Sequence, residues 1–458
     1  MLWRVLQREV QLRVYWLQRQ AVLSRQIIRS QGVRSWMRRV RRRTARHSRP
    51  PAAPLFRLAE QWAPLALDTS PSPDVSIVIP AHNGSLYTYT CLRSLAGGTG
   101  VAHEVIVVDD QATDDTPAML AAVAGARVVR NAGARGFVHA CNLGARHARG
   151  RVLVFLNNDT VCRPGWLQAL RETLDADPRA GVVGARLLFA DGSLQEAGGV
   201  VWRDGSAGNI GRHADPATPG FNYLREVDYC SAACLAIRRE LFRDLGGFDT
   251  AFAPAYYEDV DLCFRVRAAG YRVLVQPAAS VVHFEGSSVG RPGLAGLKRY
   301  QLLHQRRFRE RWREMLASHP VNGSPASTRA NRARPRVLVI GASPDGERPS
   351  EAARLVDGLA DLVRQGGRAV VAAADLAATV PHADALQRRG IEVLSAPSTR
   401  SVEHHLLDAE LPYDVVLLGR HATAVAHLPT VARVMPGARV VFDAAALDAL
   451  GHARAPVA

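Results

Sequence analysis

Residues 74–110 have the sequence DVSIVIPAHNGSLYTYTCLRSLAGGTGVAHEVIVVDD. Two short apolar runs rich in Val and Ile, Val75–Pro80 and Glu104–Asp109, flank a segment that we expect to be helical, around 86–96. Alternation of short apolar strands with helices predicts an α/β fold with a largely parallel sheet. The same alternation continues with strands at Ala126–Arg130 and Arg151–Leu156 and helices around 116–124 and 137–148.

A second α/β pattern occupies residues 336–458, after a predicted linker at 316–335. It predicts a second Rossmann-like unit of about 120 residues, separate from a first α/β domain at 74–315. We expect its strands at Arg336–Ile340, Ala369–Ala373, Ile391–Leu394, Asp414–Leu418 and Arg439–Phe442, and helices at 350–366 and 381–389.

The positive charge of the chain is concentrated at its start. The net charge of the 458 residues is +16, yet residues 1–49 contain fourteen arginines and a single acid, Glu9. The remainder is therefore close to neutral, with 47% hydrophobic and 22% charged residues overall, as in globular proteins. Apolar residues at helical spacing between these arginines predict a basic amphipathic helix at 1–47, followed by a proline-rich linker at 48–73.

Two interpretations of this basic helix remain open. It binds an anionic membrane surface through residues 1–45, or it packs on the protein or on a partner with its arginines in solvent. No nucleic-acid-binding motif accompanies it, so we expect no nucleic-acid partner. The six cysteines form no CxxC pair, and neither a signal peptide nor a membrane-spanning run is evident. We therefore expect a cytoplasmic protein, with peripheral binding to the inner face of the cytoplasmic membrane under the first interpretation.

Polar residues follow three of the predicted strands of the first domain. Because ligands bind at the carboxyl ends of strands in open α/β sheets, these residues are candidates for a binding site. Asp159 is the candidate ligand of a divalent cation that neutralises a nucleotide diphosphate, and a carboxylate at the end of the second strand suits a base or ribose. The candidate nucleotide-binding and donor-binding residues are Pro80, His82, Asn83, Asp109, Asp110, Asn131, Gly136, Asn142, Asn157 and Asn158.

A dense group of acids follows at 246–262, in the sequence GGFDTAFAPAYYEDVDL. A carboxylate among aromatic and apolar neighbours can act as a general base that accepts a hydroxyl proton. Glu258 and Asp259 are the candidates for this role, and Gly247, Asp249 and Tyr257 belong to the same acceptor or donor loop. Further on, His283 ends another apolar strand, where it is a structural residue or a metal ligand beside Asp159.

Residues 74–315, about half of the chain, resemble the family 2 glycosyltransferases of the GT-A fold, especially their rhamnosyltransferase-like branch. The resemblance depends on VSIVIPAHN, EVIVVDD, NAGARGFVHACNLGA, LVFLNND, LQEAGG, GGFDTAFAPAYYEDVDLCFRVRAAGYRV and VVHFEGSS, which occur in the family's order. It implies that Asp109 and Asp110 contact the nucleotide and that Asp159 and His283 hold Mg²⁺ or Mn²⁺. It also implies that Asp259 is the general base.

The resemblance further implies transfer of a sugar, rhamnose or a similar hexose, from a dTDP-, UDP- or GDP-sugar with inversion. The acceptor would be a hydroxyl of a glycan or lipid-linked glycan in bacterial cell-surface polysaccharide synthesis, such as O-antigen, capsule or cell wall. Residues 336–458 resemble the amino-terminal half of a GT-B family 4 glycosyltransferase, and we expect them to be non-catalytic. The alternative for the whole chain is a degenerate, non-catalytic scaffold in a polysaccharide assembly complex.

Overall fold

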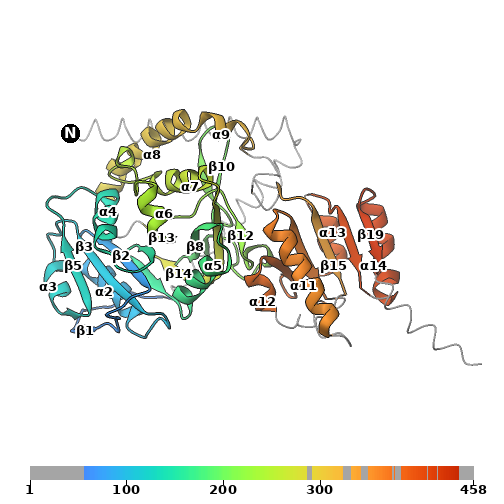
Figure 1. The fold of residues 1–458 in the computed structure, drawn as a ribbon, viewed down its shortest axis with the longest axis horizontal. Coiled ribbons are helices and arrows are strands. Elements are labelled where there is room, and N and C mark those ends of the chain that lie inside the picture. The colour runs from blue at the N-terminus through green and yellow to red at the C-terminus, as the bar shows by residue number, and fades with distance from the viewer. Residues whose placement is uncertain are drawn as a thin grey trace, which may run out of the picture.

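The computed structural model describes residues 56–285, 291–322, 328, 332–341, 349–373, 376, 383–409, 411–419 and 421–442. Figure 1 shows two α/β units side by side, the first drawn in blue to yellow and the second in orange to red. The predicted basic helix at 1–47 lies outside the described residues. Among the described residues, no helix is both long and apolar enough to cross a bilayer.

The first unit is built on a ten-stranded mixed sheet with the strand order β12-β14-β8-β13-β6-β2-β3-β5, with β7 paired to β14 and β9 paired to β8. The strands β2, β3, β5 and β6 are mutually parallel, whereas β13 runs antiparallel to both β6 and β8. These strands are β2 (Val75–Ala81), β3 (His103–Asp109), β5 (Ala126–Arg130), β6 (Val152–Leu156), β7 (Thr160–Cys162), β8 (Ala180–Leu188), β9 (Leu194–Glu196), β12 (Arg225–Glu226), β13 (Cys234–Arg238) and β14 (Arg272–His283).

Helices cover both faces of this sheet because its central strands are apolar on both sides and fully buried. On one face, Gly144 allows α4 to lie close to β2, since a Cβ at this position would stand 2.3 Å from Cγ1 of Val78. The helices are α2 (Ser85–Leu95), α3 (Thr116–Ala121), α4 (Phe137–His147), α5 (Trp166–Ala176), α6 (Arg239–Asp244), α7 (Glu258–Ala268), α8 (Arg291–Arg311) and α9 (Arg313–Ala317), and two short antiparallel strands, β10 (Gly199–Val201) and β11 (Ala207–Asn209), pair beside them.

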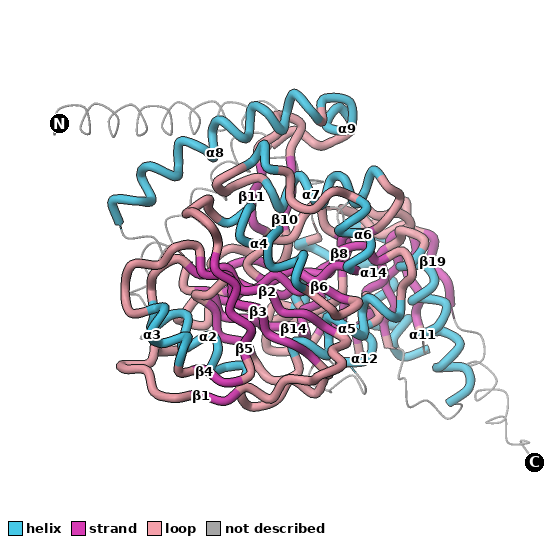
Figure 2. Tube along the Cα trace, turned by 60° about the vertical axis from the view of Figure 1, so that its left-hand side comes forward, coloured by secondary structure: helices cyan, strands magenta, loops and turns pink. Residues whose placement is uncertain are grey.

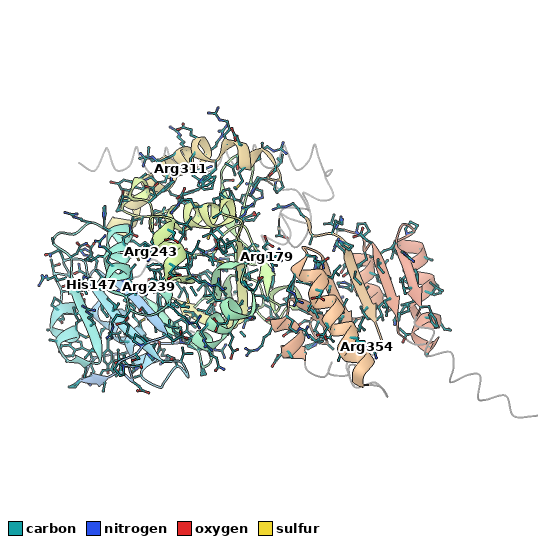
Figure 3. All side chains as sticks on the ribbon, viewed as in Figure 1. His147, Arg179, Arg239, Arg243, Arg311 and Arg354 are labelled. Carbon is teal, nitrogen blue, oxygen red and sulfur yellow. The ribbon has the colours of Figure 1, made fainter. Side chains whose placement is uncertain are left out.

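The long helix α8 runs along the outside of the first unit (Figure 2). Its last turn is fixed to α7 through Asp261, which is fully buried and accepts a 2.9 Å hydrogen bond from the indole of Trp312. Arg311, labelled in Figure 3, bonds to the same carboxylate at 3.0 Å and to Asp249 at 2.6 Å. Two of the four acids of residues 246–262, Asp249 and Asp261, are therefore bonded within the first unit.

Both predicted linkers contribute to the first unit, contrary to expectation. Within 48–73, the described part packs on the body: β1 (Leu65–Ala66) pairs with β4 (Val123–Ala124), and Leu67 is buried in the core. Within 316–335, His319 is buried, and its Nδ1 lies 2.7 Å from the carbonyl oxygen of Val201. Apolar residues scattered among the prolines supply enough buried surface to order these segments, which composition alone does not reveal.

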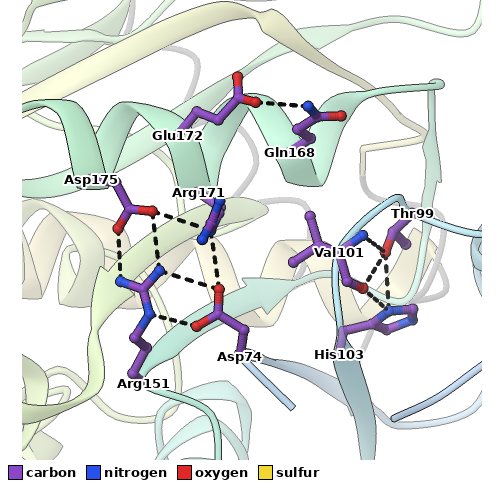
Figure 4. A network of polar contacts seen from close by, with 9 residues as sticks. All are labelled: Asp74, Thr99, Val101, His103, Arg151, Gln168, Arg171, Glu172 and Asp175. Atoms are coloured by element: carbon purple, nitrogen blue, oxygen red, sulfur yellow. Dashed lines mark hydrogen bonds and ion pairs between the residues drawn. The ribbon is translucent and has the colours of Figure 1, made fainter. Parts of the chain in front are cut away.

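A surface network of ion pairs joins the start of β2 to the neighbouring elements (Figure 4). Arg151 bridges Asp74 and Asp175, and Arg171 contacts the same two carboxylates at 3.0 and 3.1 Å. The network therefore ties β6 and α5 to the amino-terminal end of the sheet, opposite the edge at which ligands bind in such folds.

The second unit has five parallel strands in the order β17-β16-β15-β18-β19, as expected for a Rossmann-like sheet. The predicted strands are confirmed to within one residue at each end. Two of its helices, α13 and α14, had not been predicted. The elements are β15 (Arg336–Ile340), α11 (Pro349–Arg364), β16 (Arg368–Ala372), α12 (Ala383–Arg388), β17 (Ile391–Leu394), α13 (Val402–Asp408), β18 (Val415–Leu418), α14 (His421–Val434) and β19 (Arg439–Phe442).

Candidate active site

The predicted metal ligands Asp159 and His283 are brought together by the pairing of two strands. Asp159 lies directly before β7, and β7 runs antiparallel to the end of β14 with His283 opposite Thr160. This register places Nε2 of His283 3.2 Å from Oδ1 of Asp159, with both side chains almost entirely buried. Burial opposes the charged imidazole, but the nearby Asp159 carboxylate outweighs it and raises the pKa of His283.

Gln195 of β9 orients His283 from the other side of the ring. Its Oε1 lies 2.9 Å from Nδ1 of His283, and its Nε2 donates to Glu285 at 3.1 Å. Because the amide nitrogen is occupied by an acceptor, the amide oxygen faces Nδ1, which then carries the proton. With Nδ1–H held by Gln195, loss of the Nε2 proton that faces Asp159 would leave the Nε2 lone pair for a cation, as in histidine ligands held by a hydrogen-bonded neighbour.

The spacing of this pair fits a divalent cation. Two ligand atoms at about 2.1 Å from an octahedral ion, at right angles, are separated by roughly 3.0 Å, close to the observed 3.2 Å. Oδ1 of Asn157 is buried beside the pair and has no hydrogen-bond partner among the described residues. The described residues contain no group of three or more His, Cys, Asp or Glu side chains that could hold a metal. The remaining ligands would be phosphate oxygens and water, as is usual for Mg²⁺.

Glu258 and Asp259 lie at the first turn of α7, where backbone N–H groups favour negative charge. Asp259 is half-buried, and its Oδ2 accepts a 3.2 Å hydrogen bond from the Ala232 amide. Burial raises the pKa of Asp259, and burial together with the Asp259 charge raises that of Glu258 well above its usual range. The preceding Tyr257 has φ of 71°, a strained conformation for a non-glycine residue and one that occurs often at functional sites.

Glu196 follows Gln195 on β9 and lies near the backbone amides that bind Asp259, a position that the sequence did not predict. It is 2% exposed and accepts a 3.0 Å hydrogen bond from the amide of Ser231, next to the Ala232 amide that binds Asp259. Burial raises its pKa to about 7, and the charges of both Asp259 and His283 act on it. Asp259 and His283 therefore lie in one electrostatic neighbourhood, although they come from different elements.

The end of β3 organises the loop that leads into α4. Asp110 is buried, and its carboxylate accepts hydrogen bonds from Nδ2 of Asn131 at 2.8 Å, the Arg135 amide at 3.1 Å and the Gly136 amide at 2.8 Å. Gly136 has φ of 83°, and a Cβ there would lie 2.6 Å from Cβ of Pro254. Asp110, Asn131 and Gly136 thus form one structural group that shapes this side of the candidate site.

Asp109 and Asn83 hold the neighbouring loop. Asp109 is 3% exposed and accepts a 2.8 Å hydrogen bond from the Ala112 amide, while Oδ1 of Asn83 accepts one of 2.7 Å from the Thr113 amide. Nδ1 of the exposed His82 lies 2.8 Å from the Asp110 carbonyl, and Pro80 pairs with Val108 within the sheet. The ends of β2 and β3 are therefore bound to each other directly.

Comparison with known proteins assigns a family to this part of the chain. Residues 76–246 match the sequence profile of Glycosyl transferase family 2. This range contains Asp109, Asp159 and Glu196, whereas Asp259 and His283 follow it. Residues 76–246 form a family 2 glycosyltransferase domain.

Curated proteins similar to this chain share the domain but differ in length. The O-antigen biosynthesis protein RfbC of Myxococcus xanthus is 34% identical over 227 residues, 47% of this chain and 18% of that protein. The pre-mycofactocin glycosyltransferase of Mycobacterium tuberculosis is 30% identical over 248 residues, 52% of this chain and 45% of that protein. The N-acetylglucosaminyl-diphospho-decaprenol L-rhamnosyltransferase of the same species is 29% identical over 230 residues, 44% of this chain and 72% of that protein.

Two solved structures are also similar to this chain. GalNAc-T7 with UDP, GalNAc and Mn²⁺ has a TM-score of 0.41 and 18% identity, covering 54% of this chain and 49% of that one. The mannosyltransferase PcManGT of Pyrobaculum calidifontis with GDP-Man and Mn²⁺ has a TM-score of 0.39 and 20% identity, covering 60% of this chain and 74% of that one.

Several residues expected to bind the donor or acceptor have their polar groups bonded within the fold. Asn142 exchanges two hydrogen bonds with the backbone of Phe248, of 2.7 and 2.9 Å, and a Cβ at Gly247 would lie 2.7 Å from its Oδ1. Nδ2 of Asn158 donates to Thr88 at 2.9 Å, and Asp249 caps a short 3-10 helix through the Ala251 amide. We therefore leave Asn142, Asn158, Gly247 and Asp249 out of the proposed binding site. The hydroxyl of Tyr257 donates to the Gly205 carbonyl at 3.0 Å.

Proposed function

We propose that this chain is an inverting, metal-dependent glycosyltransferase that moves a sugar from a nucleotide-sugar to a hydroxyl group. The observation that supports it most is that two adjacent residues of β9 reach both groups. Gln195 bonds to His283 of the pair with Asp159, and Glu196 bonds to the Ser231 amide beside the Ala232 amide that binds Asp259. A cation-binding pair beside a base of raised pKa is the arrangement that such a transfer needs.

Each proposed role follows from the position of a side chain. Asp159 and Nε2 of His283 would hold the divalent cation, which when bound neutralises the charge developing on the diphosphate leaving group. Asp259 would accept the proton of the acceptor hydroxyl as its oxygen attacks the anomeric carbon from the side opposite the nucleotide. The carbon–oxygen bond to the diphosphate breaks as the new one forms, which inverts the configuration at that carbon. Glu258 is buried beside Asp259, and burial together with the Asp259 charge raises the pKa of Glu258, which favours its neutral form next to the base.

We propose the substrates as chemical classes. The ordered loops after β2 and β3, with Asp109 and Asn83, suit recognition of the nucleotide of a dTDP-, UDP- or GDP-sugar. We propose rhamnose or a similar hexose as the sugar and a glycan or lipid-linked glycan as the acceptor. The mycobacterial relative, whose name gives rhamnose and a decaprenyl-linked acceptor, supports this choice. The relatives named for O-antigen and succinoglycan biosynthesis support a role in cell-surface polysaccharide synthesis.

We also propose that the enzyme works in the cytoplasm against the inner face of the membrane, held there by residues 1–45. The fourteen arginines of residues 1–49 would bind anionic lipid, which would bring the active site to a lipid-linked acceptor. Deletion of residues 1–45 should then abolish sedimentation of the protein with anionic vesicles at low salt. Sedimentation equal to that of the full chain would contradict this part of the proposal.

The substitution Asp259→Asn tests the catalytic proposal. It keeps the shape of the side chain but removes the basic oxygen, so turnover should fall by about 10²-fold or more, with donor binding near normal. Asp244→Asn, at an exposed aspartate at the end of α6, is the matched control and should leave turnover unchanged. Wild-type turnover in the Asp259 variant would exclude this residue as the base. A wild-type chain without transferase activity on any nucleotide-sugar in Mn²⁺ would instead favour the scaffold alternative.

A further inference from the structure

A cavity of about 300 Å³ lies between the two α/β units, away from the candidate active site. Its walls come from β12 and the ends of α7 and β14 in the first unit, and from the turn between α11 and β16 in the second. Figure 1 shows β12 beside the orange helices of the second unit, at this boundary. Five arginines line the cavity, namely Arg225, Arg267, Arg272, Arg332 and Arg368.

Four of these arginines are balanced by acids. Their charges therefore serve the contact between the units or the fold of the first unit, and they leave little free positive charge. The pairs are Arg272 with Asp177 at 2.8 Å and with Glu226 at 3.1 Å, Arg368 with Glu392 at 2.5 Å, and Asp228 with Arg267 at 3.7 Å and with Arg332 at 3.3 Å.

Arg225 differs from the other four. It is 7% exposed, and its Nη1 donates a 2.7 Å hydrogen bond to the carbonyl of Gly220. Its Nε and Nη2 have no hydrogen-bond partner, and no carboxylate lies within 4 Å of it, among the residues that the structure describes. The rings of Phe221 and Tyr223 lie 5.5 and 5.3 Å from its guanidinium carbon, which places the group between aromatic surfaces.

Nε and Nη2, which lack hydrogen-bond partners among the described residues, form the edge of the Arg225 guanidinium that suits an oxyanion. Nε and Nη2 present parallel N–H groups that match two oxygens of a phosphate or carboxylate. An arginine cannot shed its proton to escape burial, so a buried and unpaired guanidinium is costly unless an anion joins it. The charge of Glu392 acts on Arg225 only through space, because the Glu392 carboxylate is bonded to Arg368.

We propose that this cavity binds a phosphate group through the Nε–Nη2 edge of Arg225. The volume admits inorganic phosphate or pyrophosphate, or the phosphate end of a larger molecule. Because the cavity has walls from both units, such a ligand would strengthen the contact between them. That contact already includes the Leu224 amide bonded to the Gln387 carbonyl at 2.8 Å and Arg179, labelled in Figure 3, bonded to the Arg364 carbonyl at 2.7 Å.

Calorimetric titration of the full chain with inorganic phosphate and pyrophosphate tests this proposal. The titrations contain EDTA, so that the candidate active site lacks a cation, and are run at constant ionic strength. Arg225→Met removes the guanidinium and should weaken binding by at least about tenfold, as expected for lost charge-assisted hydrogen bonds. Arg243→Met, at a 73% exposed arginine on α6, is the matched control and should bind like the wild type.

A second variant and two further ligands make the outcome decisive. Arg225→Lys keeps the positive charge but loses the two parallel N–H groups, so it should also bind phosphate more weakly. This variant tests the proposal even if the methionine variant does not fold. Titration with UDP distinguishes a nucleotide source of the phosphate from the free ion, and acetate tests the ligand class. The proposal is overturned if neither phosphate nor pyrophosphate binds the wild-type chain. It is also overturned if acetate binds equally well, or if both Arg225 variants retain wild-type affinity.

Discussion

The carboxyl edges of the two sheets differ far more than their architectures do. Both units have neighbouring parallel strands flanked by helices. In the first, the strands lead into buried polar residues, among them Asp109 and Asp159, and β14 adds His283. In the second, the described residues that directly follow β15, β16, β17 and β18 are Gly341, Ala373, Ser395 and Gly419, none of them charged. We therefore expect any difference in chemistry between the two units to depend on the few residues that follow each strand, while the α/β framework positions them.

Removing the charge at the polar edge of the first sheet should have the largest effect. Asp159→Asn keeps the size of the side chain but loses the carboxylate that faces His283, so the cation is held weakly and the leaving group is poorly neutralised. We expect turnover with a nucleotide-sugar and Mn²⁺ to fall on the order of 10³-fold. The same change at Asp408, exposed at the end of α13 in the second unit, should have no effect. Equal activity of the Asp159 and Asp408 variants would show that the carboxyl edges of the two sheets do not differ in function.

A smaller loss is expected from Gln195, which acts through its hydrogen bond with His283. Gln195→Leu removes the acceptor for Nδ1–H and frees the imidazole to change tautomer, so Mn²⁺ affinity should fall about 10- to 100-fold. The measurement is the Mn²⁺ concentration that gives half-maximal activity, together with the thermal midpoint. Gln168→Leu, at an exposed residue of α5 bonded to Glu172, is the control. An unchanged Mn²⁺ requirement would show that Gln195 does not position the histidine.

The pH dependence of activity should reflect the buried acids of the first unit. Burial raises the pKa of Asp259, so the base is protonated at higher pH than an ordinary aspartate. The activity measured as kcat/KM should therefore fall, as the pH decreases, at a higher pH than the usual value of about 3.8. Burial and, in addition, the Asp259 charge raise the pKa of Glu196 to about 7, so Glu196 is already neutral where Asp259 titrates. Glu196→Gln should therefore leave this fall in place. A fall at the ordinary pKa of an aspartate would show that burial does not act on Asp259.

The sequence predicted the strands and the polar residues after them because apolar runs and strand ends are local signals. Asp159 and His283 were predicted as partners, and the register of β7 against β14 explains their contact. Gln195 and Glu196 were missed because β9 has only three residues and their partners lie far along the chain. For Asn142, nothing local distinguishes a ligand-binding amide from one that binds the Phe248 backbone. Hydrogen bonds between residues far apart in the sequence therefore show which polar side chains are bonded within the fold, and such bonds become visible only in the structure.

The smallest effect is expected at the edge of the second sheet, where β15 meets β18. Gly341 has φ of 77°, and a Cβ there would lie 2.5 Å from Oγ1 of the buried Thr423, so this point of the sheet is filled by protein. Nucleotides bind at this position in many open α/β sheets. Thr423→Val preserves the volume and removes the hydroxyl, and we expect turnover and donor affinity within about twofold of wild type, as for a substitution away from the proposed active site. A tenfold loss with an unchanged thermal midpoint would show that the second unit contributes to substrate binding, because the substitution would then act through a ligand and not through folding.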